Sequence, residues 1–361
     1  MNNNLISYGI YFSTFLLNMY LGKKFKKSKI NEKNGIVYNI ISTIIIFMPL
    51  IILSGRRVNV GTDYWSYYSY PNALGSLNVI EYINIYSFKE IGFFLICKLC
   101  YLFNNRYIIY YLLTYLICYF IFIFYKKNKR DLDLPMVIFI FCLFFFPKSL
   151  NITRQILAVS ILLNAFYNIG IDMKKYILFT IGAISIHTTA IISLVVLPYF
   201  LIKQIKGKYL EISLVIIYTI ISFIVIYCFR YYFASDYVNN SGLYSGSNLL
   251  QLLILLLQFV FMIFYRYILK IRNMEYDKWL LIFFYGILFF VVYKNYQWGF
   301  RISYYFLIAL IYVVPKVWQL LKRNTIFNIG NKFLIISFYI LQFILLYGTL
   351  KYDEIFPLIF R

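Results

Sequence analysis

Residues 36–53 have the sequence IVYNIISTIIIFMPLIIL, which contains no charged side chain. A helix needs about 20 predominantly apolar residues to cross the hydrocarbon core of a bilayer. A helix on the surface of a soluble protein would place polar residues along one side, and this stretch does not. It therefore predicts a transmembrane helix, and it sets the class of fold for the chain around it.

Similar apolar runs continue along the whole chain. Hydrophobic side chains make up 62% of the 361 residues and charged ones only 13%, whereas about 25% are charged in a typical soluble domain. This composition excludes a soluble enzyme, a secreted disulfide scaffold and a disordered regulator. We expect an all-α polytopic integral membrane protein with about 12 transmembrane helices, near residues 5–21, 36–54, 106–125, 132–147, 153–171, 175–187, 188–202, 209–229, 248–269, 278–293, 301–321 and 333–350.

The basic residues follow the expected loops. Lysine and arginine outnumber aspartate and glutamate by 35 to 13, which gives a net charge of +22. Most of these cations lie in short clusters between apolar runs, as in the cytoplasmic loops of membrane proteins, so nucleic-acid binding is not expected. The first cluster, from Lys23 to Lys33, follows the first apolar run. This run is therefore not a cleaved signal peptide, and we expect the N-terminus outside a bacterial plasma membrane.

Two segments depart from a simple alternation of crossings. Residues 91–103 are apolar but too short to cross, and Lys98 interrupts them, so we expect a helix in the outer interface or one that enters only part of the membrane. Residues 176–202 have basic clusters at both ends, which favours a helical hairpin that turns near His187, or a re-entrant helix. We expect a single membrane domain over residues 1–361, with long outer loops at about 55–90 and 230–247.

The composition gives little basis for metal chemistry. All five cysteines lie within apolar segments, and the pair Cys97 and Cys100 has no second pair or histidine cluster to complete a zinc site. Few carboxylates remain outside in the expected topology, and they form no evident cluster. We therefore expect neither a metal site nor a cofactor.

The charged residues on the outer side are the candidates for function. Arg56, Arg57, Arg154 and Arg301 are expected at the outer ends of helices, where the positive-inside bias works against them. Any one of them is explained by contact with lipid headgroups. Four arginines on the same face as a loop that bears carboxylates predict a pocket for anions at the outer membrane surface, because guanidinium groups bind phosphate through paired hydrogen bonds. His187, the single histidine, is expected at the same outer depth.

Several short motifs resemble the EpsG family of Wzy-like polymerases, which make bacterial exopolysaccharide and capsule. The resemblance covers about residues 5–350, and it depends on the order and spacing of the motifs. They are Arg56-Arg57-Val58-Asn59-Val60-Gly61-Thr62-Asp63-Tyr64 with Tyr67 downstream (R…VGTDY..Y), Glu90-Ile91-Gly92-Phe93 (E-x-G-[FY]), Arg154-Gln155-Ile156-Leu157-Ala158 (RQ.LA), Ala183-Ile184-Ser185-Ile186-His187-Thr188-Thr189-Ala190 (A…H.SA, with Thr where Ser is commoner) and Arg301 with Tyr304 and Tyr305 (R..YY).

The resemblance implies a membrane glycosyltransferase that polymerises undecaprenyl-pyrophosphate-linked oligosaccharide repeat units at the outer face of the plasma membrane. An acceptor sugar hydroxyl attacks the anomeric carbon in such a reaction, and the lipid pyrophosphate leaves. Arginines stabilise the leaving group in place of a divalent metal, so we expect a metal-independent enzyme. The implied partners are these lipid-linked oligosaccharides, the lipid bilayer, and flippase and chain-length regulator proteins.

The same motifs suggest roles for individual residues. Asp63 is the first choice for the acceptor base and His187 the second, while Glu90 is either another acid or base or the ion-pair partner of an arginine. Arg154 is expected to bind pyrophosphate with help from the N-terminus of its helix. The complete set expected to bind pyrophosphate or glycan is Arg56, Arg57, Arg154, Gln155, Arg301, Tyr64 and Tyr67.

Two other classes of function fit the sequence. A lipid-linked oligosaccharide flippase, or another transporter, has a similar number of crossings, although the halves of this chain show no repeat and the suspect charges gather on one face. A membrane acyltransferase, or a ligase that moves finished glycan to another acceptor, also suits arginine and histidine at the outer face. The sequence leaves these alternatives open.

Overall fold

The computed structural model describes residues 2–28, 35–198, 224, 247–271, 273–293, 299–321, 325–350 and 354–360. Within these ranges the regular elements are helices, and the β pairing is an isolated antiparallel bridge between Arg57 and Phe360. The expected all-α fold is confirmed for this part of the chain. Apolar segments favour helices because backbone groups in a lipid environment must pair within their own segment.

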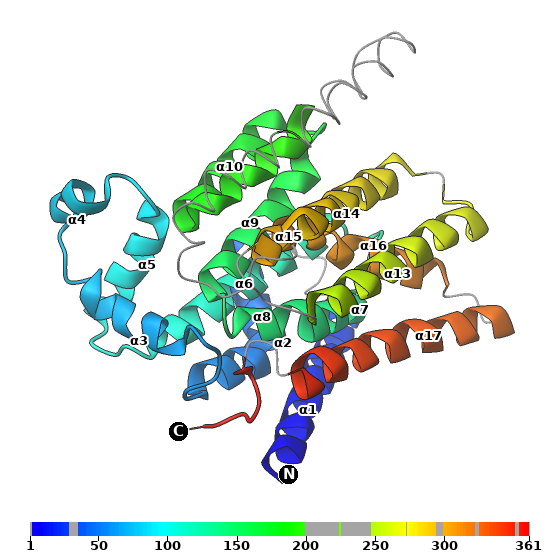
Figure 1. Ribbon diagram of the computed structural model, residues 1–361, viewed down its shortest axis with the longest axis horizontal. Coiled ribbons are helices and arrows are strands. Elements are labelled where there is room, and N and C mark those ends of the chain that lie inside the picture. The colour runs from blue at the N-terminus through cyan, green and yellow to red at the C-terminus, as the bar shows by residue number, and fades with distance from the viewer. Residues whose placement is uncertain are drawn as a thin grey trace.

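Figure 1 shows how the helices are arranged. The first half of the chain contains α1 (Asn2–Lys27), α2 (Ile36–Arg56), α3 (Tyr64–Ala73), α4 (Val79–Tyr86), α5 (Ile91–Leu102), α6 (Ile108–Lys127), α7 (Leu134–Ile140), the π-helical η2 (Phe141–Phe145), α8 (Phe146–Ser149), α9 (Thr153–Asn168), α10 (Met173–Ile186) and the 3₁₀-helical η3 (Thr188–Val196). The second half contains α13 (Ser247–Ile268), α14 (Met274–Tyr293), α15 (Gly299–Leu307), α16 (Leu310–Leu320), α17 (Ile326–Phe343) and the π-helical η4 (Ile344–Thr349).

Among the described residues, five helical stretches are long and apolar enough to cross a membrane. They are Ile36–Arg56, Ile108–Lys127, Leu249–Ile268, Arg301–Leu320 and Phe327–Thr349. The expected number of about 12 crossings is therefore not confirmed among the residues that the structure describes. One of the expected crossings, at 209–229, lies almost wholly outside those residues.

The remaining apolar runs form helices that are short, interrupted or charged. Helices α9 and α10 have 16 and 14 residues, fewer than the 20 or so that a crossing needs. The run at 134–149 is divided by η2 and carries Pro147. Helix α14 has 20 residues but begins with Glu275 and Asp277 in its first turn. Apolar content alone therefore does not establish that these runs cross the membrane.

Helix α9 lies near the middle of the bundle (Figure 1). It packs against α6 and α10, and α6 packs in turn against α2. Every residue from Gln155 to Phe166 is buried, so the apolar side chains that resembled a lipid-facing span are used for packing inside the protein. This central position fixes the first turn of α9, which carries Arg154.

Ion pairs join segments that the sequence predicts to be cytoplasmic. Lys26 at the end of α1 pairs with Asp133, which precedes α7. Lys316 of α16 pairs with Asp131, far away in the sequence. These contacts bring together the ends of helices that the alternation of basic clusters assigned to one side. The side of the membrane on which they lie stays a prediction.

The segment expected as a long outer loop at 55–90 contains two short helices, and its place outside the membrane stays a prediction. Helix α3 follows Asp63, and α4 follows Asn78, whose side chain forms a reciprocal capping box with Glu81. We call α3, α4 and α5, residues 58–103, the outer cap; it lies at the left of Figure 1. The other expected loop, 230–247, falls outside the described residues except for Ser247, where α13 begins.

Two helix boundaries fall at the positions expected from the sequence. Helix α5 is the short helix expected at 91–103. Helix α10 ends at Ile186, and His187 adopts an extended backbone with φ −149° before η3 begins. The helix is thus interrupted where the hairpin was expected to turn. The depth of both segments in a membrane remains a prediction.

Candidate functional site

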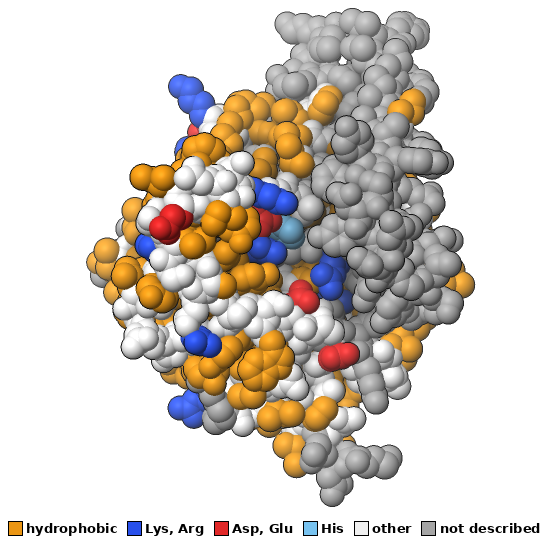
Figure 2. All heavy atoms as spheres, turned by 60° about the vertical axis from the view of Figure 1, so that its left-hand side comes forward, with side chains coloured by type: hydrophobic (Ala, Val, Ile, Leu, Met, Phe, Trp, Pro, Cys, Tyr) orange, Lys and Arg blue, Asp and Glu red, His pale blue; other side chains and the backbone are white. Residues whose placement is uncertain are grey.

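A carboxylate of the outer cap meets two basic side chains of the helical bundle. Oε2 of Glu90 accepts a hydrogen bond from Nη1 of Arg154 at 2.6 Å, and Oε1 lies 2.9 Å from Nδ1 of His187. We call these three residues the Glu90 cluster. Figure 2 shows the single histidine beside acidic and basic side chains on this face of the molecule. The structure therefore brings together residues from three separate sequence motifs.

The backbone at Glu90 depends on close packing between α5 and α10. Glu90 precedes α5 in the left-handed region, with φ 55°, a conformation that costs free energy for a residue with a side chain. Nearby, a Cβ atom at Gly92 would lie 2.5 Å from Oγ of Ser185. Glycine at position 92 thus lets α5 approach the end of α10, which carries His187.

The helix break at His187 supplies another donor to Glu90. The backbone N–H of Thr188 donates to Oε1 of Glu90 at 3.1 Å. This N–H is available because the extended backbone of His187 ends the helical hydrogen bonding of α10. Glu90 therefore receives hydrogen bonds from a guanidinium, an imidazole and a peptide N–H.

Tyr67 and Phe93 of the outer cap hold Arg154. The hydroxyl of Tyr67 accepts a hydrogen bond from the backbone N–H of Arg154 at 2.9 Å, which satisfies one of the unpaired N–H groups at the start of α9. The guanidinium carbon lies 4.9 Å from the centre of the Phe93 ring. Nε of Arg154 has no hydrogen-bond partner among the described residues. Nε is buried, so the guanidinium is held in place, and the accessible part of the side chain is the 24% that is exposed.

Arg301 and Asp63 form a second, looser pair. Nη1 of Arg301 lies 3.8 Å from Oδ2 of Asp63, and the two side chains are 31% and 37% exposed. Nε2 of Gln155 donates to the backbone carbonyl of Arg301 at 2.6 Å. The N–H of Asp63 donates to Oδ1 of Asn151 at 3.1 Å. Because Asn151 and Gln155 lie close to Arg154 in the sequence, both pairs are arranged around the start of α9.

The surroundings of Glu90 set its charge. Burial alone would raise the pKa of this carboxyl, but the hydrogen bond from His187 and the charge of Arg154 outweigh burial and lower the pKa to about 2. Glu90 is therefore ionised at neutral pH and can only accept hydrogen bonds. It follows that Nδ1 of His187 is the donor, so Nε2 is the ring nitrogen that Glu90 does not hold.

The other predicted binding residues do not contribute charge or an exposed ring to the Glu90 cluster, although the Tyr67 hydroxyl contacts Arg154. Arg57 is fully buried, and its guanidinium carbon lies 4.8 Å from the centre of the Tyr110 ring. Tyr64 is buried and stacks on the same Tyr110, with 4.9 Å between centroids. Arg56 is exposed at the end of α2. Tyr67 is buried as well, so neither tyrosine presents its ring to a substrate, and both support the outer cap instead.

Sequence reasoning did not select four residues that contribute to this region. Asn151 holds the N–H of Asp63, and Thr188 donates to Glu90. The hydroxyl of Tyr305 lies 2.7 Å from Oγ1 of Thr189. All but Asn151 belong to the motifs quoted above. Their position near His187 or Arg301 in the sequence was the signal that could have identified them. Their hydrogen bonds depend on helix packing that no local pattern reveals.

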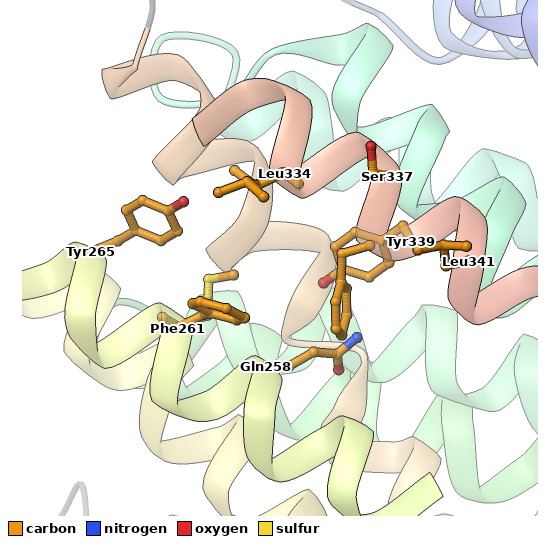
Figure 3. Close-up of a pocket in the computed structure, with 10 residues that line it drawn as sticks. Gln258, Phe261, Tyr265, Leu334, Ser337, Tyr339 and Leu341 are labelled. Carbon is orange, nitrogen blue, oxygen red and sulfur yellow. The ribbon is translucent and has the colours of Figure 1, made fainter. Parts of the chain in front are cut away.

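A separate cavity of about 220 Å³ lies between α13 and α17 (Figure 3). Its lining is mostly apolar and includes Phe261, Leu334 and Tyr339. The side chain of Gln258 contributes an amide group to the lining. None of the lining residues is charged or belongs to the Glu90 cluster. We place the candidate site at the Glu90 cluster, because acid–base chemistry and anion binding need titratable and charged groups.

The described residues contain no group of three or more histidine, cysteine, aspartate or glutamate side chains that would hold a metal ion. The Glu90 cluster itself has one carboxylate and one imidazole, and both already pair with protein groups. Metal independence therefore stays a prediction for experiment.

The helices and the charged site together define a helical membrane protein with a polar site where an outer cap meets the bundle. The model of the EpsG family matches residues 40–360, nearly the whole chain. The chain belongs to the EpsG family, and the resemblance stated from its motifs is confirmed. The family indicates a membrane protein of polysaccharide biosynthesis. No curated protein and no solved structure matches the chain.

Proposed function

We propose that this protein is a polysaccharide polymerase that joins undecaprenyl-pyrophosphate-linked oligosaccharide repeat units at the outer face of the bacterial plasma membrane. A hydroxyl of the acceptor sugar attacks the anomeric carbon of the donor sugar. The bond from that carbon to the pyrophosphate oxygen breaks, and lipid pyrophosphate leaves as an anion. The acceptor proton must pass to a base, and the leaving anion needs positive charge beside it.

The observation that carries the proposal is that the Glu90 carboxylate links Arg154 and His187 through hydrogen bonds to both. Glu90 accepts from Nδ1 of His187, so Nε2 is the atom that takes the acceptor proton. The same carboxylate holds Arg154, which offers its remaining donors to the pyrophosphate. Arg301, 31% exposed beside Asp63, is the second cation for that anion. One carboxylate thus positions both the base and the anion-binding group.

The geometry favours His187 over Asp63 as the base, which reverses the order expected from the sequence. The carboxylate of Asp63 is paired with Arg301, whose Nη1 lies 3.8 Å from Oδ2. An imidazole has a proton affinity closer to that needed near neutral pH. We therefore assign Asp63 to the orientation of Arg301 and His187 to proton transfer.

The partners follow from this reaction. The substrates are lipid-linked oligosaccharides, which reach the protein through the bilayer. A flippase must deliver them to the outer face, and a chain-length regulator acts on the product. No cofactor enters the reaction.

Cells that lack this protein test the function. Loss of a polymerase leaves single repeat units on the cell surface, and the intact gene restores long chains. Loss of a flippase leaves no repeat units outside, and loss of a ligase leaves long chains on the lipid carrier. Either of the last two results contradicts the proposed polymerase. His187→Gln, introduced into the restoring gene, should behave like the deletion while the protein still inserts.

A further inference from the structure

Helix α3 presents an aromatic side chain to solvent close to the candidate site. Trp65 is 57% exposed, whereas Tyr64 and Tyr67 are buried. Successive residues of a helix are turned by about 100°, so the face that buries Tyr64 and Tyr67 leaves Trp65 on the other side. Trp65 comes two positions after Asp63, which pairs with Arg301. The exposed indole is therefore connected to the candidate site through the first turn of α3.

The indole of Trp65 is held in one orientation. Nε1 donates to Oδ1 of Asn59 at 2.8 Å. The ring also makes edge contacts with Tyr64, at 5.1 Å between centroids and 89° between planes, and with Tyr68, at 5.6 Å and 81°. A side chain that is fixed before binding loses little conformational entropy when a ligand covers it. Trp65 is thus a rigid apolar surface rather than a mobile side chain.

Polar groups surround this surface. The guanidinium carbon of Arg106 lies 5.3 Å from the centre of the Tyr68 ring. With its amide oxygen turned toward Arg106, Asn72 accepts hydrogen bonds from Nε at 3.1 Å and from Nη2 at 2.7 Å. Asn72 and Arg106 are both exposed. A sugar ring has C–H groups on its faces and hydroxyls at its edge, so it matches an aromatic surface with an amide and a guanidinium beside it.

We propose that Trp65, Tyr68, Asn72 and Arg106 form a glycan-binding surface. Trp65 stacks on a sugar ring of the lipid-linked repeat unit or of the growing chain, and Asn72 and Arg106 bind its hydroxyls. The surface holds the saccharide beside the Glu90 cluster. The identity of the saccharide rests on the proposed polymerase function, but the binding itself does not require catalysis.

Anchoring in the membrane interface is the competing explanation for an exposed tryptophan. Interfacial tryptophans place their polar N–H toward the headgroup region. Here the N–H is bound to Asn59, and the neighbouring Ser66 and Ser69 on α3 are exposed. The geometry therefore favours a ligand that uses the ring face.

Equilibrium dialysis tests the surface with the full chain purified in detergent. The probe is the repeat-unit oligosaccharide released from its lipid carrier. We expect Trp65→Ala to weaken binding about tenfold or more, and Trp65→Phe to retain most of the affinity. Phe103→Ala is the matched control, because Phe103 at the end of α5 is 61% exposed and lies outside the surface; its affinity should equal that of the wild type.

A turnover assay with lipid-linked substrate separates this proposal from the proposed function. Trp65→Ala should raise KM with little change in kcat, whereas His187→Gln should lower kcat. Wild-type glycan affinity in Trp65→Ala overturns the glycan-binding surface even if polymer forms normally. Poor insertion of Trp65→Ala with normal glycan affinity identifies a membrane anchor and overturns it too. Trp65-dependent binding in a protein without polymerase activity supports the surface and contradicts only the polymerase.

Discussion

Nδ1 of His187 lies 2.9 Å from Oε1 of Glu90, although the two residues are 97 positions apart in the sequence. The contact exists because α5 and α10 pack closely at Gly92 and Ser185. It fixes the orientation of the imidazole, since the ionised carboxylate accepts only from a protonated Nδ1. The base proposed for the acceptor hydroxyl therefore depends on the docking of the outer cap against the bundle.

His187→Gln and Asp63→Asn distinguish the two candidate bases. At saturating lipid-linked substrate we expect His187→Gln to lose about a hundredfold or more in turnover, which is typical of a lost general base. Asp63→Asn should lose less, because its neighbour Arg301 keeps its own charge. Near-normal turnover in His187→Gln, with a large loss in Asp63→Asn, would restore Asp63 as the base.

Glu90→Gln should lower turnover and also change how stability depends on pH. The folded protein lowers the pKa of Glu90 from its ordinary value of 4.5 to about 2. Glu90 therefore stabilises the folded state above pH 4.5, and this contribution is lost as the pH falls from 4.5 toward 2. Thermal unfolding in detergent across this window should show a smaller loss of stability for Glu90→Gln than for the wild type.

Glu81→Gln is the matched control for that measurement. Glu81 is an exposed glutamate of the same outer cap, and glutamine also satisfies the capping box that it forms with Asn78. Its pH dependence and turnover should match those of the wild type. An identical pH profile in Glu90→Gln and Glu81→Gln would show that the Glu90 carboxylate contributes nothing particular to stability.

The sequence predicts the fold class well but not the number of crossings. An uncharged run such as 36–53 predicts a helix because lipid offers no partners to its backbone, and α2 confirms the helix. The run at 153–171 was also expected to cross, although it carries Arg154 and Gln155, and α9 buries it inside the bundle. Lipid and a protein interior are both apolar, so hydropathy cannot separate these two environments.

The same limit applies to the candidate site. The motifs identify Glu90, Arg154 and His187 because charged groups are rare in apolar segments. They do not reveal that Tyr64 and Tyr67 point inward while Trp65 points outward. That choice depends on which side of α3 packs against Tyr110 and Arg154, and only the packed structure fixes it.

Arg154→Lys should fail to replace Arg154. A lysine ammonium cannot both pair with Glu90 and lie flat against Phe93, and it cannot offer the paired donors that suit pyrophosphate. We expect polymer synthesis to fall about tenfold or more, with normal insertion on immunoblots. Arg130→Lys is the control, because Arg130 is exposed in the basic segment after α6. This variant should remain active. Normal polymer length in Arg154→Lys would indicate that position 154 needs only a positive charge.

Polymerisation in purified membranes should persist in excess EDTA. The expectation comes from Arg154 and Arg301, which supply the positive charge that a divalent ion would otherwise provide for a leaving pyrophosphate. The assay compares polymer length with and without the chelator. Activity that disappears in EDTA and returns with magnesium or manganese would contradict the assignment of the two arginines.

Single cysteines test the side of the membrane on which the outer cap lies. Ser69 on α3 and Arg130 after α6 are both exposed, while the four described cysteines are buried and should give little background; Cys228 is replaced by serine in both variants. A thiol reagent that cannot cross the membrane should label Ser69→Cys in intact cells, and should label Arg130→Cys only after the membrane is opened. Helix α6 separates the two positions and is a candidate span, so one crossing between them explains this result.

Equal labelling of both cysteines would require an even number of crossings between them, for example with α5 also spanning. That result would overturn the predicted topology, whereas a Ser69→Cys that labels only after the membrane is opened would place the outer cap on the inner side and contradict polymerisation at the outer face.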